Sequence, residues 1–181
     1  MSNHTLSMKF ISKSLIAASL LFSTLICSAQ SAAKNVVKVK PGIEVLEERG
    51  FDCLKGKRVG LLTNPTGITS DVRSTIDILQ NAPEVNLVAL FGPEHGVRGN
   101  IYAGEKIVDV VDESTGLPVH SLYGATRQPT KEMFEGIDVL VYDIQDVGVR
   151  SYTFISCLGL AMRTAAETGV KVVGLDRPNP L

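Results

Sequence analysis

Short apolar runs alternate with amphipathic stretches along most of the chain. Turn residues bound each of the clearest runs, a pattern that is typical of buried strands. The stretches between the runs repeat apolar residues at helical spacing, which predicts helices that pack on a sheet. We predict strands at 58–63, 85–91, 137–143 and 171–175.

Helical spacing and capping residues place helices between these strands. Ser70 and Asp71 are expected to cap a helix that turns Val72, Ile76 and Leu79 toward the core. Shorter helices are predicted at 43–49 and 129–135, and a long helix from about 152 to 168 whose apolar stripe is Ile155, Leu158, Met162 and Ala165.

The order of these elements predicts the fold class. Residues 107–111 and 117–122 flank a turn and indicate either a hairpin or an excursion that ends in a further strand, and Pro118 favours an edge position. Strands that alternate with helices are typical of parallel pairs joined by crossovers. We therefore predict a three-layer α/β fold with a mostly parallel sheet.

The first 29 residues have the pattern of a secretory signal peptide. Lys9 and Lys13 precede an apolar stretch over 14–27, and small residues follow it. A membrane anchor is the alternative, but the stretch is shorter than the ~20 residues that span a bilayer. We expect an exported protein, periplasmic or secreted, with no stable membrane insertion after cleavage and with residues 30–181 as its folded domain.

The cysteines leave two alternatives open. Cys27 raises the possibility of a lipoprotein, which the bulky Ile26 before it disfavours. Cys53 and Cys157 could pair in an exported protein. Because Cys157 falls in an apolar helical stretch, we expect it to be a buried free thiol. Their spacing does not match a metal site, and no metal or cofactor is expected.

Composition and charge narrow the class of partner. Apolar residues make up 44% of the chain and charged residues 20%, as in ordinary globular proteins. Removal of Lys9 and Lys13 with the signal peptide leaves 16 basic residues against 19 acidic ones, a net charge of −3. No basic run is present, so we expect no nucleic-acid partner.

Polar loops follow the four clearest predicted strands. They span 64–67, 92–100, 143–150 and 176–180, whereas the connections at the opposite ends of the strands are plain turns. In a parallel sheet these four loops lie at the same edge, where ligands bind in open α/β folds. This asymmetry predicts a functional site at the carboxyl edge of the sheet.

Glu94 and His95 stand on the most unusual of these loops, Gly92 to Asn100. A carboxyl group on a glycine-rich loop can be partly desolvated, which raises its pKa and suits general acid catalysis. Such a carboxylate can also simply cap backbone N–H groups. His95 could orient Glu94, bind substrate or serve as a structural hydrogen-bonding group.

Two further carboxylates follow the clearest strand. Asp143 and Asp146, facing Glu94, would suit glycoside hydrolysis, and they would equally suit a divalent cation. The alternative is that Asp143 caps a turn and Asp146 pairs with Arg150. Arginines at this edge could hold an anionic substrate, and Tyr152 and Asn64 could contact a sugar. The three arginines are Arg98, Arg150 and Arg177.

Several common sites are missing from the sequence. No G-x-G-x-x-G follows the first strand, so a dinucleotide site is unsupported. Neither a phosphate-binding P-loop nor a G-x-S-x-G nucleophile elbow is present.

Four motifs in this order resemble a known family. They are Leu62-Thr63-Asn64-Pro65-Thr66-Gly67, Phe91-Gly92-Pro93-Glu94-His95-Gly96, Tyr142-Asp143-Ile144-Gln145-Asp146-Val147-Gly148 with Arg150 and Tyr152, and Asp176-Arg177-Pro178-Asn179-Pro180. Together they resemble the NamZ-type exo-β-N-acetylmuramidases, also called DUF1343, from about residue 41 to the end.

The resemblance implies a fold, an activity and a site. It implies a Rossmann-like N-terminal domain, here incomplete before a smaller C-terminal domain, and release of N-acetylmuramic acid from the non-reducing end of peptidoglycan fragments. The family's glutamate maps to Glu94. We take Glu94, Asp143 and His95 as catalytic candidates, and Asn64, Arg98, Gln145, Asp146, Arg150, Tyr152 and Arg177 as substrate-binding candidates.

Two other functions stay open at this point. A non-catalytic binder of periplasmic sugars or muropeptides could use the same cleft, although aromatic residues are only 6% of the chain and tryptophan is absent. A metal-dependent hydrolase could use Glu94, His95, Asp143 and Asp146 as ligands.

Overall fold

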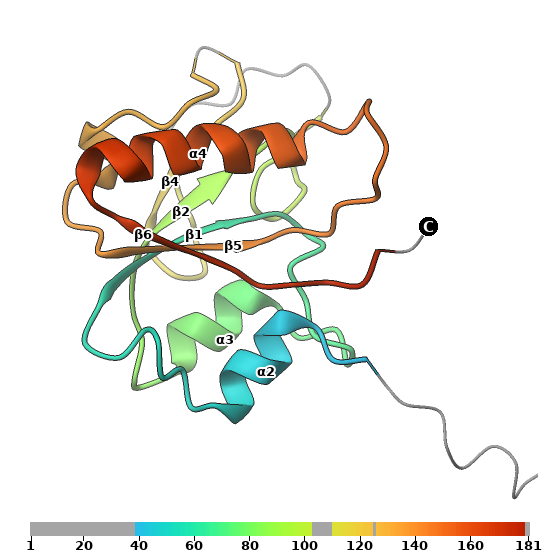
Figure 1. Ribbon diagram of the computed structural model, residues 1–181, viewed down its shortest axis with the longest axis vertical. Helices are drawn as coiled ribbons and strands as arrows, with labels where there is room; N and C mark the ends of the chain where they lie inside the picture. Colours follow the sequence, from blue (N-terminus) through green and yellow to red (C-terminus); the bar gives the residue numbers. More distant parts are fainter. Residues whose placement is uncertain (1–38, 103–109, 125, 180–181) are drawn as a thin grey trace, which may run out of the picture. The chain divides into compact units, whose positions relative to one another are not determined.

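A six-stranded sheet forms the centre of the fold (Figure 1). The structure, a computed structural model, describes residues 39–102, 110–124 and 126–179. The order is β3-β4-β2-β1-β5-β6, and each neighbouring pair is parallel except β3 with β4. The strands are β1 (Arg58–Thr63), β2 (Asn86–Gly92), β3 (Val110–Val111), β4 (Pro118–Ser121), β5 (Val139–Asp143) and β6 (Lys171–Gly174).

The order in which the chain adds parallel strands reverses between β1 and β5. From β1 the chain adds β2 and β4 on one side, then returns to add β5 and β6 on the other. When only the parallel strands are numbered along the chain, this order is 3-2-1-4-5, the Rossmann order, in which ligands bind at the carboxyl ends of the strands where the strand order reverses. The register pairs Thr63 at the end of β1 with Asp143 at the end of β5.

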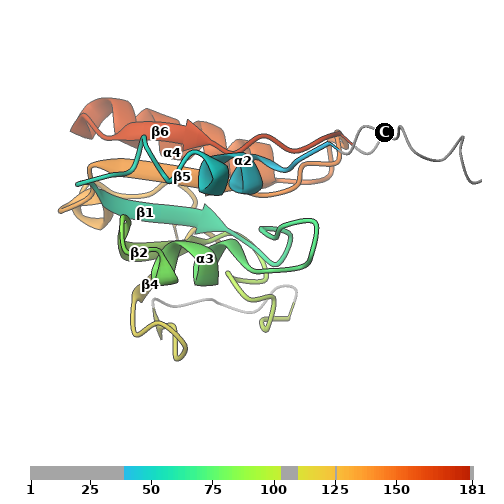
Figure 2. The same ribbon diagram turned by 90° about the horizontal axis from the view of Figure 1, so that it is seen from below.

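Helices cover both faces of the sheet, as the sequence predicts (Figures 1 and 2). Helices α2 (Gly42–Glu48) and α3 (Thr75–Asn81) cover one face, and α4 (Phe154–Thr168) covers the other. Each face has its own apolar core: Leu46, Leu61 and Leu79 lie in one cluster, and Leu62 and Ala161 in the other. The three-layer α/β architecture is confirmed.

Helix α3 starts later than its sequence pattern indicates. The Ser74 hydroxyl oxygen accepts a hydrogen bond from the backbone N–H of Ile76 at 3.2 Å and caps the helix. Before it, the N–H of Thr69 donates to the carbonyl of Arg73 at 2.9 Å and closes a loop. Val72 lies in this loop with φ of +67° and is 73% exposed. The predicted start at Ser70 and Asp71 is therefore wrong, because loop hydrogen bonds replace the first helical turn.

The apolar stripe expected on α4 is also shifted around the helix. Of the predicted stripe, Ala165 is buried and Leu158 packs against the core, whereas Ile155 and Met162 are about half exposed, at 56% and 51%. The residues that α4 buries are smaller, namely Cys157, Ala161, Thr164 and Ala165. Small side chains let the helix lie close to the sheet, so steric fit rather than side-chain hydropathy chose the buried face. Cys157 is buried and unpaired, as expected, and Cys53 is exposed and unpaired.

The hairpin prediction holds where the structure describes it. Strand β3 pairs antiparallel with β4 and is the outer strand, so Pro118 is not at the edge of the sheet. Pro118 is the first residue of β4, a position that needs no N–H. The helix predicted at 129–135 is a single 3₁₀ turn, η2 (Glu132–Phe134).

Two sequence predictions fall partly or wholly outside the described residues. The signal peptide at 1–29 does so entirely, and the hairpin does so at 107–109. Among the described helices, none combines the length and apolarity that a membrane span requires.

Candidate functional site at the carboxyl edge of the sheet

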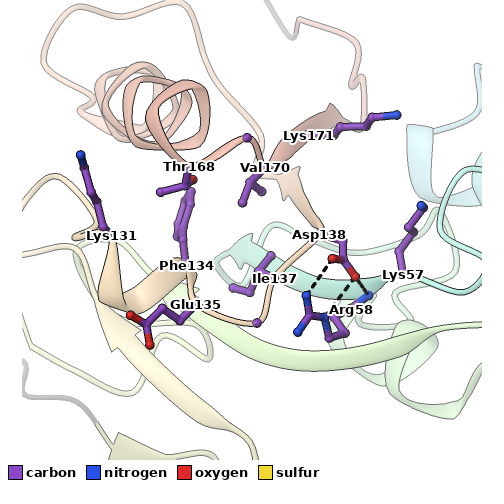
Figure 3. A pocket seen from close by; sticks show the side chains of 12 residues that line it. Lys57, Arg58, Lys131, Phe134, Glu135, Ile137, Asp138, Thr168, Val170 and Lys171 are labelled. Carbon is purple, nitrogen blue, oxygen red and sulfur yellow. Dashed lines mark hydrogen bonds and ion pairs between the residues drawn. The ribbon is translucent and has the colours of Figure 1, made fainter.

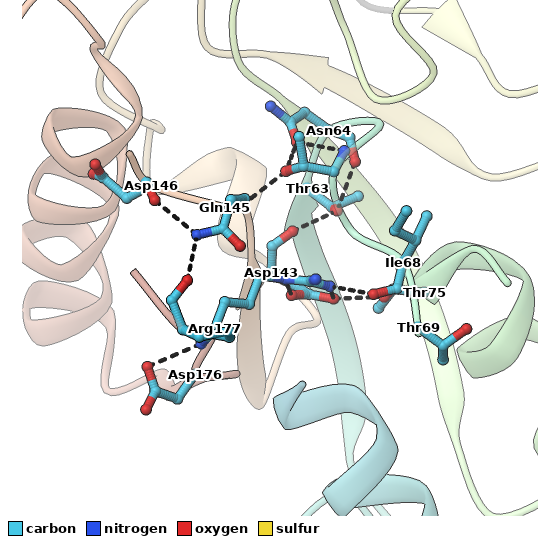
Figure 4. Close-up of polar contacts among 12 residues, drawn as sticks. Thr63, Asn64, Ile68, Thr69, Thr75, Asp143, Gln145, Asp146, Asp176 and Arg177 are labelled. Carbon is cyan, nitrogen blue, oxygen red and sulfur yellow. Dashed lines mark hydrogen bonds and ion pairs between the residues drawn. The ribbon is translucent and has the colours of Figure 1, made fainter. Parts of the chain in front are cut away.

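A buried ion pair occupies the switch point between β1 and β5. Asp143 is fully buried, and the Arg177 side chain is 7% exposed. The guanidinium donates from Nε to Oδ1 at 2.6 Å and from Nη2 to Oδ2 at 2.8 Å, and the hydroxyl of Thr75 also donates to Oδ2 (Figure 4). Because both carboxylate oxygens have partners, Asp143 positions the loops around it and does not face Glu94 as an open second carboxylate.

The turn after β1 is built onto the backbone of Asp143. The Thr63 hydroxyl donates to the Asp143 carbonyl oxygen at 2.7 Å. A Cβ atom on Gly67 would lie 2.2 Å from Thr63 Oγ1 and 3.0 Å from the same carbonyl, so only glycine fits there. Asn64, which is 6% exposed, starts this turn, and the N–H of Gly67 donates to its carbonyl at 2.9 Å.

Gln145 connects three of the polar loops (Figure 4). Its backbone N–H donates to Thr66 Oγ1 at 2.8 Å, which ties it to the turn after β1. Its side-chain Nε2 donates to the carbonyls of Asp146 at 2.7 Å and Pro178 at 3.0 Å. Asp146 is partly buried, and its Oδ1 accepts from the N–H of Gly148 at 2.8 Å. The loops after β1, β5 and β6 are therefore one connected unit.

The loop that carries Glu94 lies against that unit. A Cβ atom on Gly99 would lie 2.6 Å from Cγ of Pro65, so the two loops are in direct contact. His95 adopts φ of +73°, which few non-glycine residues do. Its Nδ1 lies 3.1 Å from the carbonyl oxygen of Ile101, and because a carbonyl only accepts, Nδ1 carries the proton. Nε2 of this exposed imidazole then remains an acceptor when the ring is neutral.

Tyr123 is a site residue that sequence reasoning missed. It follows β4, and the N–H of Leu122 donates to the Gly92 carbonyl at 2.8 Å, which sets Tyr123 beside the start of the Glu94 loop. The Glu94 carboxylate interacts with the Tyr123 hydroxyl and raises the pKa of that hydroxyl. The signal was available, since Tyr123 also follows a strand at the carboxyl edge.

The neighbouring β5 residues Tyr142 and Asp143 project from opposite faces of the sheet. Asp143 turns to the α3 side, where Thr75 holds it, whereas Tyr142 packs in the apolar cluster beneath α4. Among the described residues, the Tyr142 hydroxyl is a buried polar group with no hydrogen-bond partner. Burial raises the pKa of both Tyr142 and Cys157. This period-2 alternation separates Asp143 from the α4 side of the site.

The remaining arginines and Tyr152 lie away from the ion pair. Arg98 donates to both oxygens of Asp112, at 2.7 and 3.0 Å, on the β3–β4 side of the Glu94 loop. It was expected to bind an anionic substrate, and its guanidinium is instead engaged with Asp112. Arg150 is exposed, and Tyr152 is 48% exposed and stacks edge-on against Phe154.

A large hollow also lies at the opposite edge of the sheet (Figure 3). It measures about 630 Å³, and Lys57, Lys131 and Lys171 line it. Arg58 donates there to both oxygens of Asp138, at 3.2 and 2.9 Å, and Lys131 pairs with Glu167. Its acidic partners offset much of the basic charge, and it is remote from the switch point, so we place the candidate site at the carboxyl edge.

The described residues also bear on the metal-dependent alternative. Within 39–102, 110–124 and 126–179, no group of three or more His, Cys, Asp or Glu side chains is arranged to hold a metal ion. Glu94, His95, Asp143 and Asp146 therefore do not form a ligand set.

Comparison with known proteins identifies the family. Residues 59–181 match the family model described as the N-terminal part of the exo-β-N-acetylmuramidase NamZ. The chain belongs to the NamZ N-terminal family. It is 48% identical over 166 residues to the peptidoglycan β-N-acetylmuramidase NamZ of Bacillus subtilis strain 168, a match that covers 89% of this chain and 40% of the relative.

Solved structures of the NamZ/DUF1343 family share the fold. A DUF1343 family protein from Bacteroides fragilis NCTC 9343 superposes with a TM-score of 0.74 at 61% identity, covering 81% of this chain and 36% of that one. A second DUF1343 protein of that organism has a TM-score of 0.66 at 37% identity, covering 80% and 36%. The chain thus spans about two fifths of the length of the NamZ relative and slightly less of the solved structures.

Proposed function

We propose that this chain forms the Glu94-bearing part of an exo-acting glycoside hydrolase that releases N-acetylmuramic acid from the non-reducing end of peptidoglycan fragments. Membership of the NamZ family supports this most directly. The position of Glu94 at the carboxyl edge, beside the switch point of a Rossmann-order sheet, agrees with it. The amino-terminal pattern of a signal peptide fits an exported enzyme of cell-wall recycling, in the periplasm or outside the cell.

Glu94 is the general acid/base in this proposal. It is partly buried, and Tyr123 contacts its carboxylate. This contact fixes the position of the carboxyl group on its loop, and a positioned carboxyl group can transfer a proton to or from the reacting oxygen. His95, on the same loop, has an accepting nitrogen available at the exposed side of the ring.

Asp146 is the better placed of the two candidate second carboxylates. Asp143 has both oxygens engaged with Arg177 and Thr75, whereas the recorded partner of the Asp146 carboxylate is the N–H of Gly148 at Oδ1. Asp146 also lines a pocket of about 400 Å³ at the carboxyl ends of β5 and β6, together with Gln145. We assign Asp146 the role of orienting the substrate or the attacking water.

Turnover of a chromogenic β-N-acetylmuramide by the protein, with the matching N-acetylglucosaminide as control, tests the activity. We expect release from the muramide only. The Glu94→Gln variant should lose at least about 100-fold in kcat, in line with the usual contribution of a general acid/base. Glu135→Gln is the matched control, since Glu135 is exposed at the opposite edge.

Three outcomes would overturn parts of this proposal. Near-full turnover in Glu94→Gln would remove Glu94 from the chemistry. Loss of activity with EDTA, restored by a divalent cation, would return the metal-dependent alternative. Binding of muropeptides without any release would indicate the non-catalytic binder.

A further inference from the structure

The side-chain amide of Asn64 is fixed in one orientation. The backbone N–H of Thr66 donates to Asn64 Oδ1 at 3.0 Å, and the Thr66 hydroxyl donates to the same atom at 2.5 Å. An N–H group cannot accept, so the atom that it meets is the amide oxygen and not the nitrogen. Both lone pairs of Oδ1 are thus in use, and Nδ2 points away from the turn (Figure 4).

Asn64 Nδ2 therefore presents donors only. Among the described residues, the structure records no partner for this nitrogen, although the residue is 94% buried. The turn that holds it is itself anchored, because Thr66 Oγ1 accepts from the N–H of Gln145 at 2.8 Å. A donor that is held rigidly by its neighbours binds a ligand at a low entropic cost.

The side-chain amide of Gln145 can act only as an acceptor toward a ligand, the opposite of Asn64. Both hydrogens of its Nε2 are occupied, one by the carbonyl of Asp146 and the other by that of Pro178. The Gln145 side chain therefore has no further hydrogen to donate, and a ligand can only donate to its Oε1. This oxygen has no drawn contact (Figure 4), and Gln145 lines the pocket of about 400 Å³ at the ends of β5 and β6.

The two amides are joined through a single hydroxyl. Thr66 Oγ1 accepts from the Gln145 backbone and donates to the Asn64 side chain. The switch point thus carries a donor-only group and an acceptor-only group on either side of Thr66. A secondary amide has one N–H and one C=O, which point in opposite directions in its trans form.

We propose that Asn64 and Gln145 together recognise the acetamido group of the bound sugar, Asn64 Nδ2 donating to its carbonyl oxygen and Gln145 Oε1 accepting from its N–H. This assignment rests on the proposed function for the ligand class and goes beyond it in naming the groups that select an N-acetylated sugar. Both are binding residues, and neither takes part in proton transfer.

Matched ligands separate the two contacts. Methyl β-glycosides that share the 3-O-lactyl ether of muramic acid would carry at C2 an acetamido group, an O-acetyl ester or a free amine, and calorimetry would give their affinities for the protein. The ester keeps the carbonyl and lacks the N–H, and the amine lacks the carbonyl. We expect the ester to bind about 5- to 10-fold and the amine about 100-fold more weakly than the amide.

Variants then assign each contact to its residue. Asn64→Asp keeps the oxygen that Thr66 holds and replaces the donor with an acceptor, so acetamide affinity should fall about 10- to 100-fold. Gln145→Met should abolish the difference between amide and ester. Thr66→Val is the control for orientation, and it should cost less than Asn64→Asp because the Thr66 N–H still holds the amide. Thermal melts would verify that each variant is folded.

The possible outcomes test the recognition pair separately from the proposed function. Wild-type affinity for the acetamide in both Asn64→Asp and Gln145→Met would overturn the recognition pair. An unchanged amide–ester difference in Gln145→Met would overturn the role of Gln145. Failure of the wild type to prefer the amide over the amine would overturn both residues. Binding with these preferences but without hydrolysis would support recognition of the acetamido group by Asn64 and Gln145 and would overturn the proposed hydrolase function.

Discussion

Arg177 holds Asp143 by two parallel hydrogen bonds across 34 positions of sequence, at 2.6 and 2.8 Å. The same guanidinium donates from Nη2 to the carbonyl of Ile68 at 2.8 Å, so it also fixes the loop before α3. The carboxylate is fully buried and the arginine nearly so. A pair with this burial and bidentate geometry depends on both partners, because either charge alone would be left in an apolar interior.

Replacing Arg177 by methionine should therefore cost about 3–5 kcal/mol of unfolding free energy. The double variant Asp143→Leu/Arg177→Met should recover much of this loss, since it removes the uncompensated charge. Urea unfolding of the wild type, the single variants Arg177→Met and Asp143→Leu, and the double variant would measure the coupling. A loss below about 1 kcal/mol in Arg177→Met would show that the pair is not stabilising in this sense.

Glu94 should control the acidity of Tyr123. The Glu94 carboxylate raises the pKa of the Tyr123 hydroxyl, mainly through their side-chain contact and then through its negative charge. In Glu94→Gln the charge is gone, so the pKa of Tyr123 should fall toward its ordinary value. Titration of ¹³Cζ-labelled tyrosine by NMR would follow this residue, with Glu135→Gln as control. An unchanged Tyr123 titration would show that the two side chains do not interact.

The pair of Arg98 and Asp112 should make stability fall in acid. Hydrogen bonds from Arg98, with further help from Thr115, lower the pKa of Asp112 to about 2. A group whose pKa is lower in the folded state stabilises the fold at a pH above its unfolded pKa of 3.8, and that contribution is lost as the pH falls toward about 2. After allowance for solvent screening at Arg98, the contribution is about 1–2 kcal/mol.

Denaturant unfolding at about pH 6, 4 and 2.5 would test this assignment, because this range runs from above the unfolded pKa of Asp112 to near its folded pKa. Other carboxylates also titrate in this range, Asp138 among them. The informative quantity is therefore the difference between the wild type and Arg98→Gln. That difference should shrink between pH 4 and 2.5, and a constant difference would assign the acid sensitivity to other groups.

Gly67→Ala should loosen the site without touching any proposed contact to substrate. The new Cβ would meet Thr63 Oγ1 at 2.2 Å and the Asp143 carbonyl at 3.0 Å. We expect a loss of about 1–3 kcal/mol in unfolding free energy, as for other strained insertions into packed sites. In a Thr63→Ala background the loss should be smaller, because the nearest clashing atom is gone.

Gly159→Ala is a fitting control for that substitution. Gly159 lies in α4, and a Cβ there would meet nothing within 4 Å. Alanine is favoured over glycine inside helices by roughly 0.8–1 kcal/mol, so this variant should be more stable than the wild type. Equal effects of the two alanines would contradict the steric account of Gly67.

The sequence predicts the sheet and the edge that carries the site because both depend on local patterns. Strand β1 was predicted with the bounds that the structure has, and β5 lies within the predicted run. Periodicity was only half right at α4, where Ala165 is buried and Leu158 packs on the core, but fit against the sheet also buries Cys157 and Ala161 in preference to the larger Ile155 and Met162. That choice depends on the distance between helix and sheet, which no local pattern encodes.

At the site, the sequence predicts which residues gather but not how they pair. Asn64, Asp143, Gln145, Asp146 and Arg177 do belong to one network. Whether Asp143 would face Glu94 or Arg177 depended on the face of β5 from which it projects, and Thr75 gave no signal at all in the sequence. Catalytic and binding roles for the individual residues stay predictions that the experiments above would test.

The hydrogen bonds around Asp143 also constrain the order in which the chain folds. Its backbone carbonyl is bonded to Thr63, 80 positions earlier, and its carboxylate to Thr75, 68 positions earlier. Closing loops of this length costs entropy that only a nearly complete sheet can offset. The polar centre of the site should thus assemble after the strands have paired, and loss of the arginine should accelerate unfolding far more than it slows refolding.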